Sequence, residues 1–197
     1  KINSEDELYI LGDFFEQWIG DDHENQFISL IKKNLRKKTT SGSKIYFMHG
    51  NRDFLIGKKF CNDVNSILLD DPHELEISRK KILLMHGDSL CTDDKDYQEF
   101  RSLVRNKNWQ EEFLSKDLNE RMEVAKSLRE VSKLENKSKD EAIMDVNNLE
   151  VLKIIEENSL DLLIHGHTHR PFVHDENGVP RMAVSYTHLR AHETINH

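Results

Sequence analysis

The sequence predicts an α/β fold, because strand signals alternate with helix signals and a long helical stretch interrupts them. Apolar runs at residues 8–11 and 44–48 each stop at polar residues, which is typical of buried strands. Between these runs, residues 25–38 carry apolar side chains at helical spacing. From residue 94 to residue 158 the strand signals vanish and helical spacing takes over. We therefore expect one domain with a helical insertion.

Composition limits the class of protein and its partners. The chain has 197 residues, of which 37% are hydrophobic and 32% charged, as in a folded domain and not a disordered chain. Its net charge of -8 disfavours nucleic acid as a partner. No apolar run approaches the roughly 20 residues that a membrane-spanning helix needs. Cys61 and Cys91 lack metal-type spacing and are expected to be reduced thiols.

The first predicted elements form a strand, a helix and a strand, which favours a parallel βαβ unit. The helix owes its single apolar stripe to Phe27, Leu30, Ile31 and Leu35. Further along, residues 74–77 and 81–85 predict two short strands joined by a polar turn.

The predicted insertion, at about residues 94–158, shows two apolar stripes at helical spacing. One stripe comprises Leu114, Leu118, Met122, Ala125 and Leu128, and the other Val151, Leu152 and Ile155. Another strand is predicted at residues 161–164, and Asn177 with Gly178 gives a strong hairpin signal.

Four predicted strands end in polar motifs that contain metal-binding residue types. The candidate ligands are Asp13, Asn51, His86, His167 and His169. Loops at the carboxyl ends of strands line the binding crevice of an open α/β sheet, so we expect these side chains to converge. Each motif alone is commoner as a turn, but their joint order is far more specific.

The chemistry of these ligands favours a divalent transition metal. Oxygen and imidazole ligands without thiolate suit Mn²⁺, Fe²⁺ or Zn²⁺, and we prefer manganese. Asp13 has two carboxylate oxygens and could bridge two cations about 3.5 to 4 Å apart, the separation used in two-metal phosphate hydrolysis.

The motif order resembles that of the calcineurin-like metallophosphoesterases, whose motifs are Asp-x-His, Gly-Asp, Gly-Asn-[His or Arg]-[Asp or Glu], His and Gly-His-x-His. All but the first motif are matched here, and the resemblance places that motif before Lys1. It implies an αββα sandwich over residues 1–184 with a helical cap insertion, incomplete in this chain. It also implies two Mn²⁺ ions per complete site, with catalytic roles for Asp13, Asn51, Arg52 and His86. Arg52 stands where many relatives have histidine, and its guanidinium suits phosphate binding but not proton donation.

The flanking sequences resemble the branch of this family that hydrolyses UDP-2,3-diacylglucosamine in lipid A biosynthesis. The similar segments are residues 11–22, 49–57, 86–94 and 142–147. The resemblance implies cleavage of the diphosphate to UMP and 2,3-diacylglucosamine 1-phosphate. The implied substrate contacts are Asn51, Arg52, Asp94, Ser132, Asn136, Lys139 and His167. Without the resemblance, Ser132, Asn136 and Lys139 would be read as a solvated helix face.

Several alternatives remain open from the sequence. The aromatic residues Trp109 and Phe113 are either helix core or part of a cap that shelters acyl chains. The protein could act on another nucleotide diphosphate, or serve as a non-catalytic metal-binding scaffold. A lipid substrate implies a cytoplasmic enzyme docked peripherally on the inner membrane of a Gram-negative bacterium.

The two ends of the chain carry expectations of their own. Residues 185–197 fit no strand or helix period and are expected to be non-native, so His188, His192 and His197 are excluded from the chemistry. The unmatched first motif leads us to expect impaired activity from this chain alone.

Overall fold

The computed structural model describes residues 6–138 and 143–185, apart from the side chains of residues 133 and 135–138. Lys139 and residues 186–197 of the expected tail lie outside these ranges, as does the side chain of Asn136.

The first sheet is the predicted parallel unit, extended by one strand. Its strands are β1 (Glu7–Ile10), β2 (Lys44–Met48) and β3 (Ile67–Leu69), in the order β1-β2-β3. Helix α1 (Gln26–Thr40) connects β1 to β2, and α2 (Lys58–Val64) connects β2 to β3. Both strand pairs are parallel, with Tyr9 opposite Tyr46. The βαβ prediction is confirmed, whereas α2 and β3 were not predicted.

The second sheet has a parallel centre and antiparallel edges. It contains β4 (His73–Ile77), β5 (Lys80–Met85), β6 (Leu162–His165), β7 (Phe172–Glu176) and β8 (Val179–Ala183). Their order is β4-β5-β6-β8-β7, in which β5, β6 and β8 are parallel. The outer strands β4 and β7 pair antiparallel with β5 and β8, and so form hairpins.

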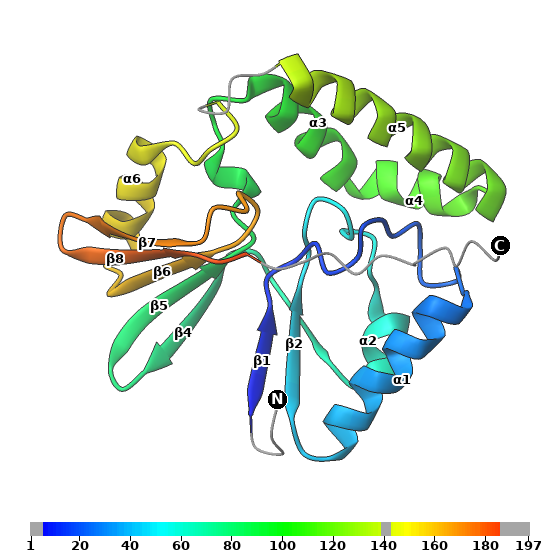
Figure 1. The fold of residues 1–197 in the computed structure, drawn as a ribbon, viewed down its shortest axis with the longest axis horizontal. Helices are drawn as coiled ribbons and strands as arrows, with labels where there is room; N and C mark the ends of the chain where they lie inside the picture. Colours follow the sequence, from blue (N-terminus) through cyan, green and yellow to red (C-terminus); the bar gives the residue numbers. More distant parts are fainter. Residues whose placement is uncertain (1–5, 139–142, 186–197) are drawn as a thin grey trace, which may run out of the picture.

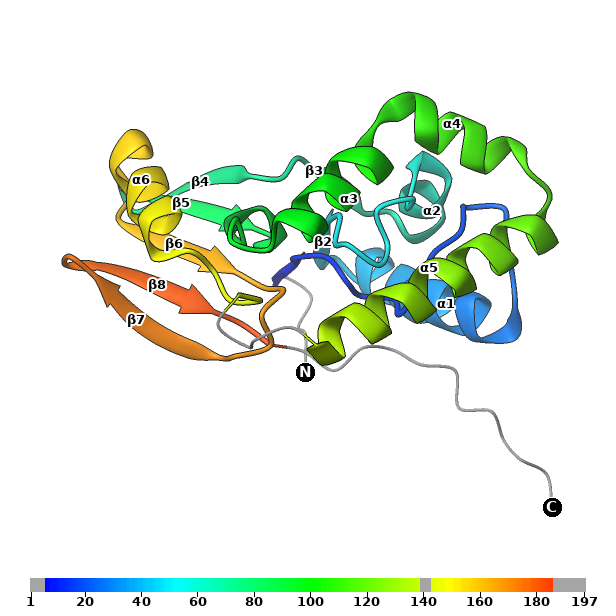
Figure 2. The same cartoon turned by 90° about the horizontal axis from the view of Figure 1, so that it is seen from above.

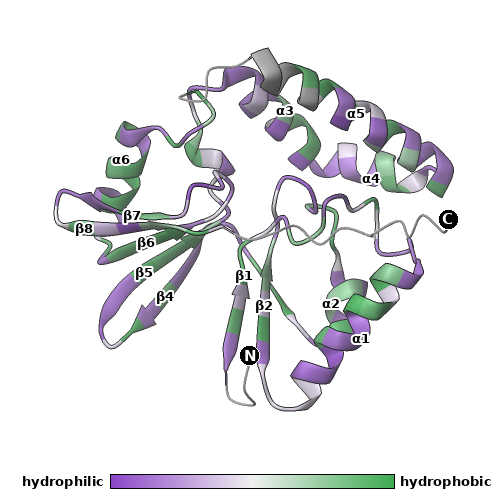
Figure 3. Cartoon of the chain, viewed as in Figure 1, coloured by the Kyte–Doolittle hydropathy of each residue, from purple (hydrophilic) through white to green (hydrophobic). Residues whose placement is uncertain are grey.

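The two sheets pack face to face and are covered on the outside by helices, as the predicted αββα sandwich requires (Figures 1 and 2). Leu11 and Met48 from the first sheet and Leu84 from the second belong to one buried cluster between the sheets. Figure 3 shows hydrophobic residues along the strands of both sheets. Helices α1 and α2 pack beside the first sheet. Helix α6 (Asn148–Asn158) covers the second sheet, where its Val151 and Ile155 belong to another buried cluster with Leu83 and Leu163.

Three helices cross the top of the sandwich and form what we call the cap: α3 (Lys95–Arg105), α4 (Lys107–Ser115) and α5 (Leu118–Ser138) (Figure 1). The prediction of one stripe from Leu114 to Leu128 is wrong, because the chain breaks between α4 and α5. The Asp117 carboxylate accepts hydrogen bonds from the backbone N–H groups of Asn119 and Glu120 and so starts a new helix.

The predicted insertion therefore contains two structurally different parts. Its α3, α4 and α5 make up the cap, whereas α6 belongs to the sandwich itself. Phe113 is buried in the core beside the first sheet, with Trp109 stacked on it at 5.2 Å, which supports the core interpretation of this pair. Cys61 and Cys91 are free thiols, as predicted, and the structure buries both of them. None of the helices in the described ranges is long and apolar enough to span a bilayer.

Candidate metal centre

Four of the predicted metal ligands meet where the two sheets come together. Asp13 follows β1 and Asn51 follows β2, whereas His86 follows β5 and His167 follows β6. One ligand atom from each of Asp13, His86 and His167 lies within 4.8 Å of the others. Asn51 Oδ1 lies 3.1 Å from His86 Nε2 and 3.0 Å from His167 Nδ1. Figure 1 shows the strand ends meeting beneath the cap.

Hydrogen bonding fixes which nitrogen of His86 faces the site. Its Nδ1 lies 2.7 Å from the carbonyl oxygen of Leu11 and therefore donates to it. Its Nε2 then accepts from the backbone N–H of Asn51 at 3.3 Å, and it lies 3.1 Å from Asn51 Oδ1 and 3.8 Å from Asp13 Oδ1. Several electron-pair donors thus converge on one point, which is the arrangement that a divalent cation requires.

The surroundings of His167 and His86 shift the pKa values of these two histidines in opposite directions. Burial, with help from nearby His86, lowers the pKa of His167 to about 4, so this imidazole is neutral at pH 7 and can act as a ligand. Burial opposes charge on His86 too, but the carboxylates of Asp13 and Asp88 outweigh it and raise the His86 pKa. The surroundings of His86 therefore favour a positive charge at this point, whether a proton or a metal ion carries it.

The ligand-bearing turns have an unusual backbone. Asp13, His167 and His169 have φ angles of 54°, 65° and 55°, in the left-handed region that residues with a Cβ seldom adopt. Non-glycine residues at ordinary turns and helix ends, such as Asn65 and Asn177, adopt the same region, so this backbone accompanies the candidate ligands and does not by itself mark function.

Asp53 organises the two loops that carry Asp13 and Asn51. This fully buried carboxylate accepts hydrogen bonds from the backbone N–H groups of Asp13 at 3.0 Å, Phe15 at 3.2 Å and Gly50 at 2.9 Å. Burial and the neighbouring Asp13 raise the Asp53 pKa to about 6. Asp53 is the last residue of the Gly-Asn-Arg-Asp motif, and its role as an anchor for both loops could not be predicted from that motif.

Arg52 contacts the carboxylate of Asp13, which is also a candidate metal ligand. Its backbone N–H donates to Asp13 Oδ1 at 2.8 Å, and its Nε lies 3.4 Å from Asp13 Oδ2. A guanidinium beside a candidate metal ligand is placed to meet an anion that approaches the metal.

His169 stands apart from the central group. The compact group of potential ligands among the described residues comprises Asp13, His86 and His167 and does not include it. Burial and then Arg52 lower the pKa of His169, so its surroundings disfavour a charged ring.

The expected substrate contacts in the cap region differ in exposure: Asp94 is buried, whereas Ser132 is exposed. Asp94 is buried and caps α3 by accepting from the backbone N–H of Tyr97 at 3.1 Å. Ser132 lies exposed on α5, and the backbone of Asn136 belongs to the same helix.

An ion-pair network around the buried Asp88 fastens cap helix α3 to the loop that carries His86. Asp88 accepts from Tyr97 Oη at 2.9 Å and pairs with Arg101 Nε at 2.9 Å. Burial opposes the charge on Asp88, but His86 and Arg101 outweigh it and hold its pKa well below the usual range. The Tyr97 ring lies 5.7 Å from the His167 ring, centroid to centroid. Sequence reasoning missed Tyr97 and Arg101, because nothing in a helical stretch indicates which polar residues face inward.

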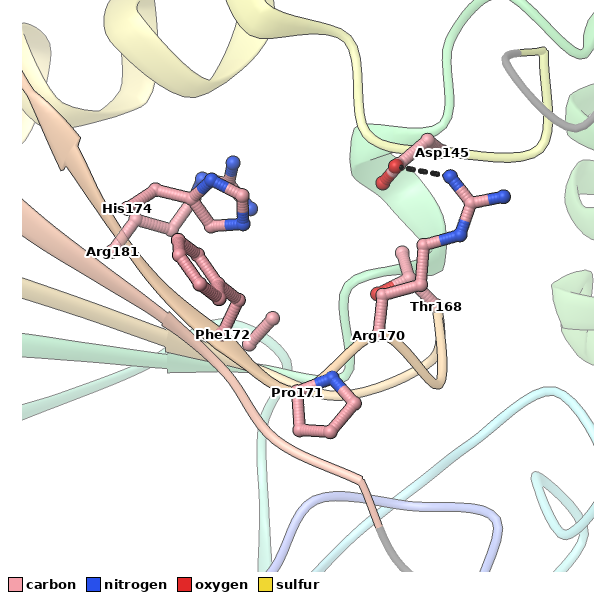
Figure 4. Close-up of a pocket in the computed structure, with 8 residues that line it drawn as sticks. Asp145, Thr168, Arg170, Pro171, Phe172, His174 and Arg181 are labelled. Carbon is pink, nitrogen blue, oxygen red and sulfur yellow. Dashed lines mark hydrogen bonds and ion pairs between the residues drawn. The ribbon is translucent and has the colours of Figure 1, made fainter.

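A separate cavity of about 280 Å³ lies over β7 and β8 (Figure 4). An ion pair of 2.7 Å between Arg170 and Asp145 stands at its edge, and Thr168 from the turn between His167 and His169 also lines it. Asp13, Asn51 and His86 do not line it. The cavity is therefore a neighbour of the metal centre and not the centre itself.

The chain is similar to known proteins over most of its length. Residues 1–171 match the family described as calcineurin-like phosphoesterase. The chain is 48% identical over 170 residues to a UDP-2,3-diacylglucosamine hydrolase of Chromohalobacter salexigens, covering 86% of this chain and 69% of that protein. Proteins of the same name from Marinobacter nauticus and Shigella dysenteriae are 50% and 47% identical, each over 175 residues. These alignments cover 88% and 89% of this chain, and 72% and 73% of the relatives.

Proposed function

Because the chain belongs to the calcineurin-like phosphoesterase family, we propose that this hydrolase cleaves the diphosphate of UDP-2,3-diacylglucosamine, a step of lipid A biosynthesis. The products would be UMP and 2,3-diacylglucosamine 1-phosphate. The substrate is that named for the relatives, which are 45–50% identical over most of this chain.

The observation that carries the proposal is the convergence of Asn51 Oδ1, His86 Nε2 and His167 Nδ1 beside Asp13. These residues fit a divalent cation, because they offer lone pairs and one negative charge and because His167 stays neutral at pH 7. Asp13, Asn51, His86 and His167 would hold one ion. His169, together with Asp13 and ligands from the Asp-x-His motif of the family, would hold the second.

Mn²⁺, when bound, would activate water and neutralise phosphate charge. The protein residues would orient the metal ligands, stabilise negative charge and contact the substrate. The Leu11 carbonyl fixes the tautomer of His86, so its Nε2 faces the site. Arg52 stabilises the negative charge that grows on the phosphate oxygens, and its high basicity keeps it from acting as a proton donor. Asp94, Ser132, Asn136 and Lys139 of the cap region would contact the rest of the substrate.

A lipid substrate also suggests where the protein works. We propose peripheral docking on the cytoplasmic face of the inner membrane, through the outer surface of the cap. Val131 and Leu134 on α5 are 52% and 68% exposed, so this helix offers apolar side chains to a lipid surface.

The test is Mn²⁺-dependent release of UMP from UDP-2,3-diacylglucosamine by the full-length protein. His167→Ala removes a ligand and should abolish release, whereas His23→Ala, outside the site, should retain it. Equal cleavage of a deacylated substrate would indicate a general nucleotide diphosphatase. Mn²⁺ binding without any release would favour a scaffold.

A further inference from the structure

Glu16 joins two arginines that come from different parts of the molecule. It follows Asp13 by three residues in the loop after β1. Arg52 Nη1, from the loop after β2, donates to Glu16 Oε2 at 2.6 Å. Arg129, from cap helix α5, forms an ion pair with the same carboxylate and donates Nη1 to the Glu16 carbonyl oxygen at 2.9 Å. We call Arg129, Glu16 and Arg52 the Glu16 bridge.

The Glu16 bridge continues directly to the metal centre. The Arg52 Nε lies 3.4 Å from Asp13 Oδ2, and its backbone N–H donates to Asp13 Oδ1 at 2.8 Å. The side chains of Arg129, Glu16 and Arg52 are 31%, 18% and 29% exposed, and that of Asp13 is 2% exposed. Partly buried ion pairs of this kind are screened less by salt than surface pairs, so the contacts can hold a geometry.

A second arginine ties the same helix to the same loop. Arg121 lies eight residues before Arg129, about two turns of α5, and is 3% exposed. It donates to the Ile19 carbonyl oxygen at 2.8 Å and pairs with Asp22. Helix α5 is thus anchored at two points on the loop that carries Asp13, and a shift of the helix would be transmitted to that loop.

We propose that Glu16 is a positioning residue that couples cap helix α5 to Arg52 and thereby to the metal centre. The inference rests on the hydrolase function proposed above. Glu16 holds the Arg52 guanidinium beside Asp13, and Arg129 holds Glu16. An arginine side chain is long and flexible, so without this carboxylate Arg52 would spend less time where a phosphate binds the metal. Arg129 therefore affects the reaction without touching the substrate.

The competing explanation is that Arg129 contacts the substrate directly. A small phosphodiester distinguishes direct contact from coupling through Glu16. Bis(4-nitrophenyl) phosphate lacks the nucleotide and acyl parts that the cap would contact. Direct contact would make Arg129 matter for UDP-2,3-diacylglucosamine alone. Coupling through Glu16 would make it matter for the small diester too.

The experiment measures kcat and KM for bis(4-nitrophenyl) phosphate with Mn²⁺, using the full-length protein. The variants are Glu16→Gln, Arg129→Gln and the double variant, with exposed Lys126→Gln on the same helix as the matched control. We expect each single change to lower kcat about tenfold, and the double change to lower it no further than Glu16→Gln. Arg129→Lys should recover part of the loss. Mn²⁺ affinity should stay unchanged, because none of these residues is a ligand.

A double variant whose losses multiply, or an Arg129→Gln protein with normal activity on the small diester, would overturn the proposal. A second readout does not need turnover: the NMR resonance of the Arg52 Nε–H group, identified by its loss in Arg52→Lys. It should shift in both Glu16→Gln and Arg129→Gln, and an unchanged resonance in Arg129→Gln would also overturn the coupling. Cleavage of the small diester without cleavage of UDP-2,3-diacylglucosamine would instead contradict the proposed substrate.

Discussion

Among the single residues around the centre, Asp53 has the most hydrogen bonds to the ligand loops. Its carboxylate accepts from three backbone N–H groups: those of Asp13 itself, of Phe15 two residues later, and of Gly50 directly before Asn51. Two oxygens that accept several donors cannot be replaced by an amide, because an amide nitrogen donates and would face those N–H groups.

We expect Asp53→Asn to lower the free energy of unfolding by about 1–3 kcal/mol, the cost of a buried hydrogen-bonding group left unsatisfied. It should also weaken Mn²⁺ binding, because the loops that carry Asp13 and Asn51 lose their common anchor. Urea unfolding at pH 7 in EDTA measures the first effect and Mn²⁺ titration the second. Exposed Asp96→Asn on α3 is the control, and equal stability of the two variants would contradict the role of Asp53.

Sequence reasoning located Asp13, Asn51, His86 and His167, because each follows an apolar strand and strand ends meet in an α/β sheet. It could not locate Asp53 or Tyr97, whose roles depend on what approaches them in three dimensions. The Tyr97 hydroxyl reaches Asp88 only because cap helix α3 packs against the loop that follows β5. The sequence around a polar residue in a charged helix does not indicate whether that residue makes such a contact.

At the scale of elements, the junction of β1 and β2 with their loops leaves no space for a side chain at Gly12. This glycine has φ of 83°, and a Cβ there would lie 2.4 Å from Gly50 N and 2.7 Å from His86 Nδ1. The strand ends are therefore as close as their backbones permit, and the tautomer-fixing contact of His86 depends on that closeness.

Gly12→Ala should lower the free energy of unfolding by more than about 3 kcal/mol, because backbone and not a flexible side chain would have to move. Gly178→Ala is a matched control: it also has positive φ, of 91°, but nothing lies within 4 Å of an added Cβ. We expect that control to cost about 1 kcal/mol. Thermal unfolding of both variants makes the comparison, and similar losses would show that conformational strain alone, not crowding, limits Gly12.

The elements that the sequence did not reveal are short or exposed. Strand β3 has three residues, of which Ile67 and Leu68 are exposed, so its apolar run does not mark a buried face. Helix α2 has seven residues, too few for a clear period. The α4–α5 break was missed because Lys116 and Asp117 interrupt a stripe that remains apolar on both sides.

For the whole molecule, the metal centre lies across the boundary between the two sheets. Asp13 and Asn51 come from the first sheet, whereas His86 and His167 come from the second. A cation held by all four would connect the two halves of the sandwich, in addition to the buried cluster between them.

Mn²⁺ should therefore raise the temperature of unfolding, by an amount that grows with concentration. At a free Mn²⁺ concentration 100 times Kd, the stabilisation would be about 2.7 kcal/mol. Scanning calorimetry with and without EDTA measures it, and His86→Ala should remove most of the shift. A shift of equal size in that variant would mean that Mn²⁺ binds elsewhere.

The ligands are also far apart along the chain, and this separates them in time during synthesis. Asn51 and His167 touch through side chains that are 116 residues apart. A ribosome takes on the order of ten seconds to make such a length. During most of that interval the nascent chain has Asp13, Asn51 and His86 but lacks β6, so the centre forms only after β6 has emerged. Loading of the metal would then report that nearly the whole domain has been made.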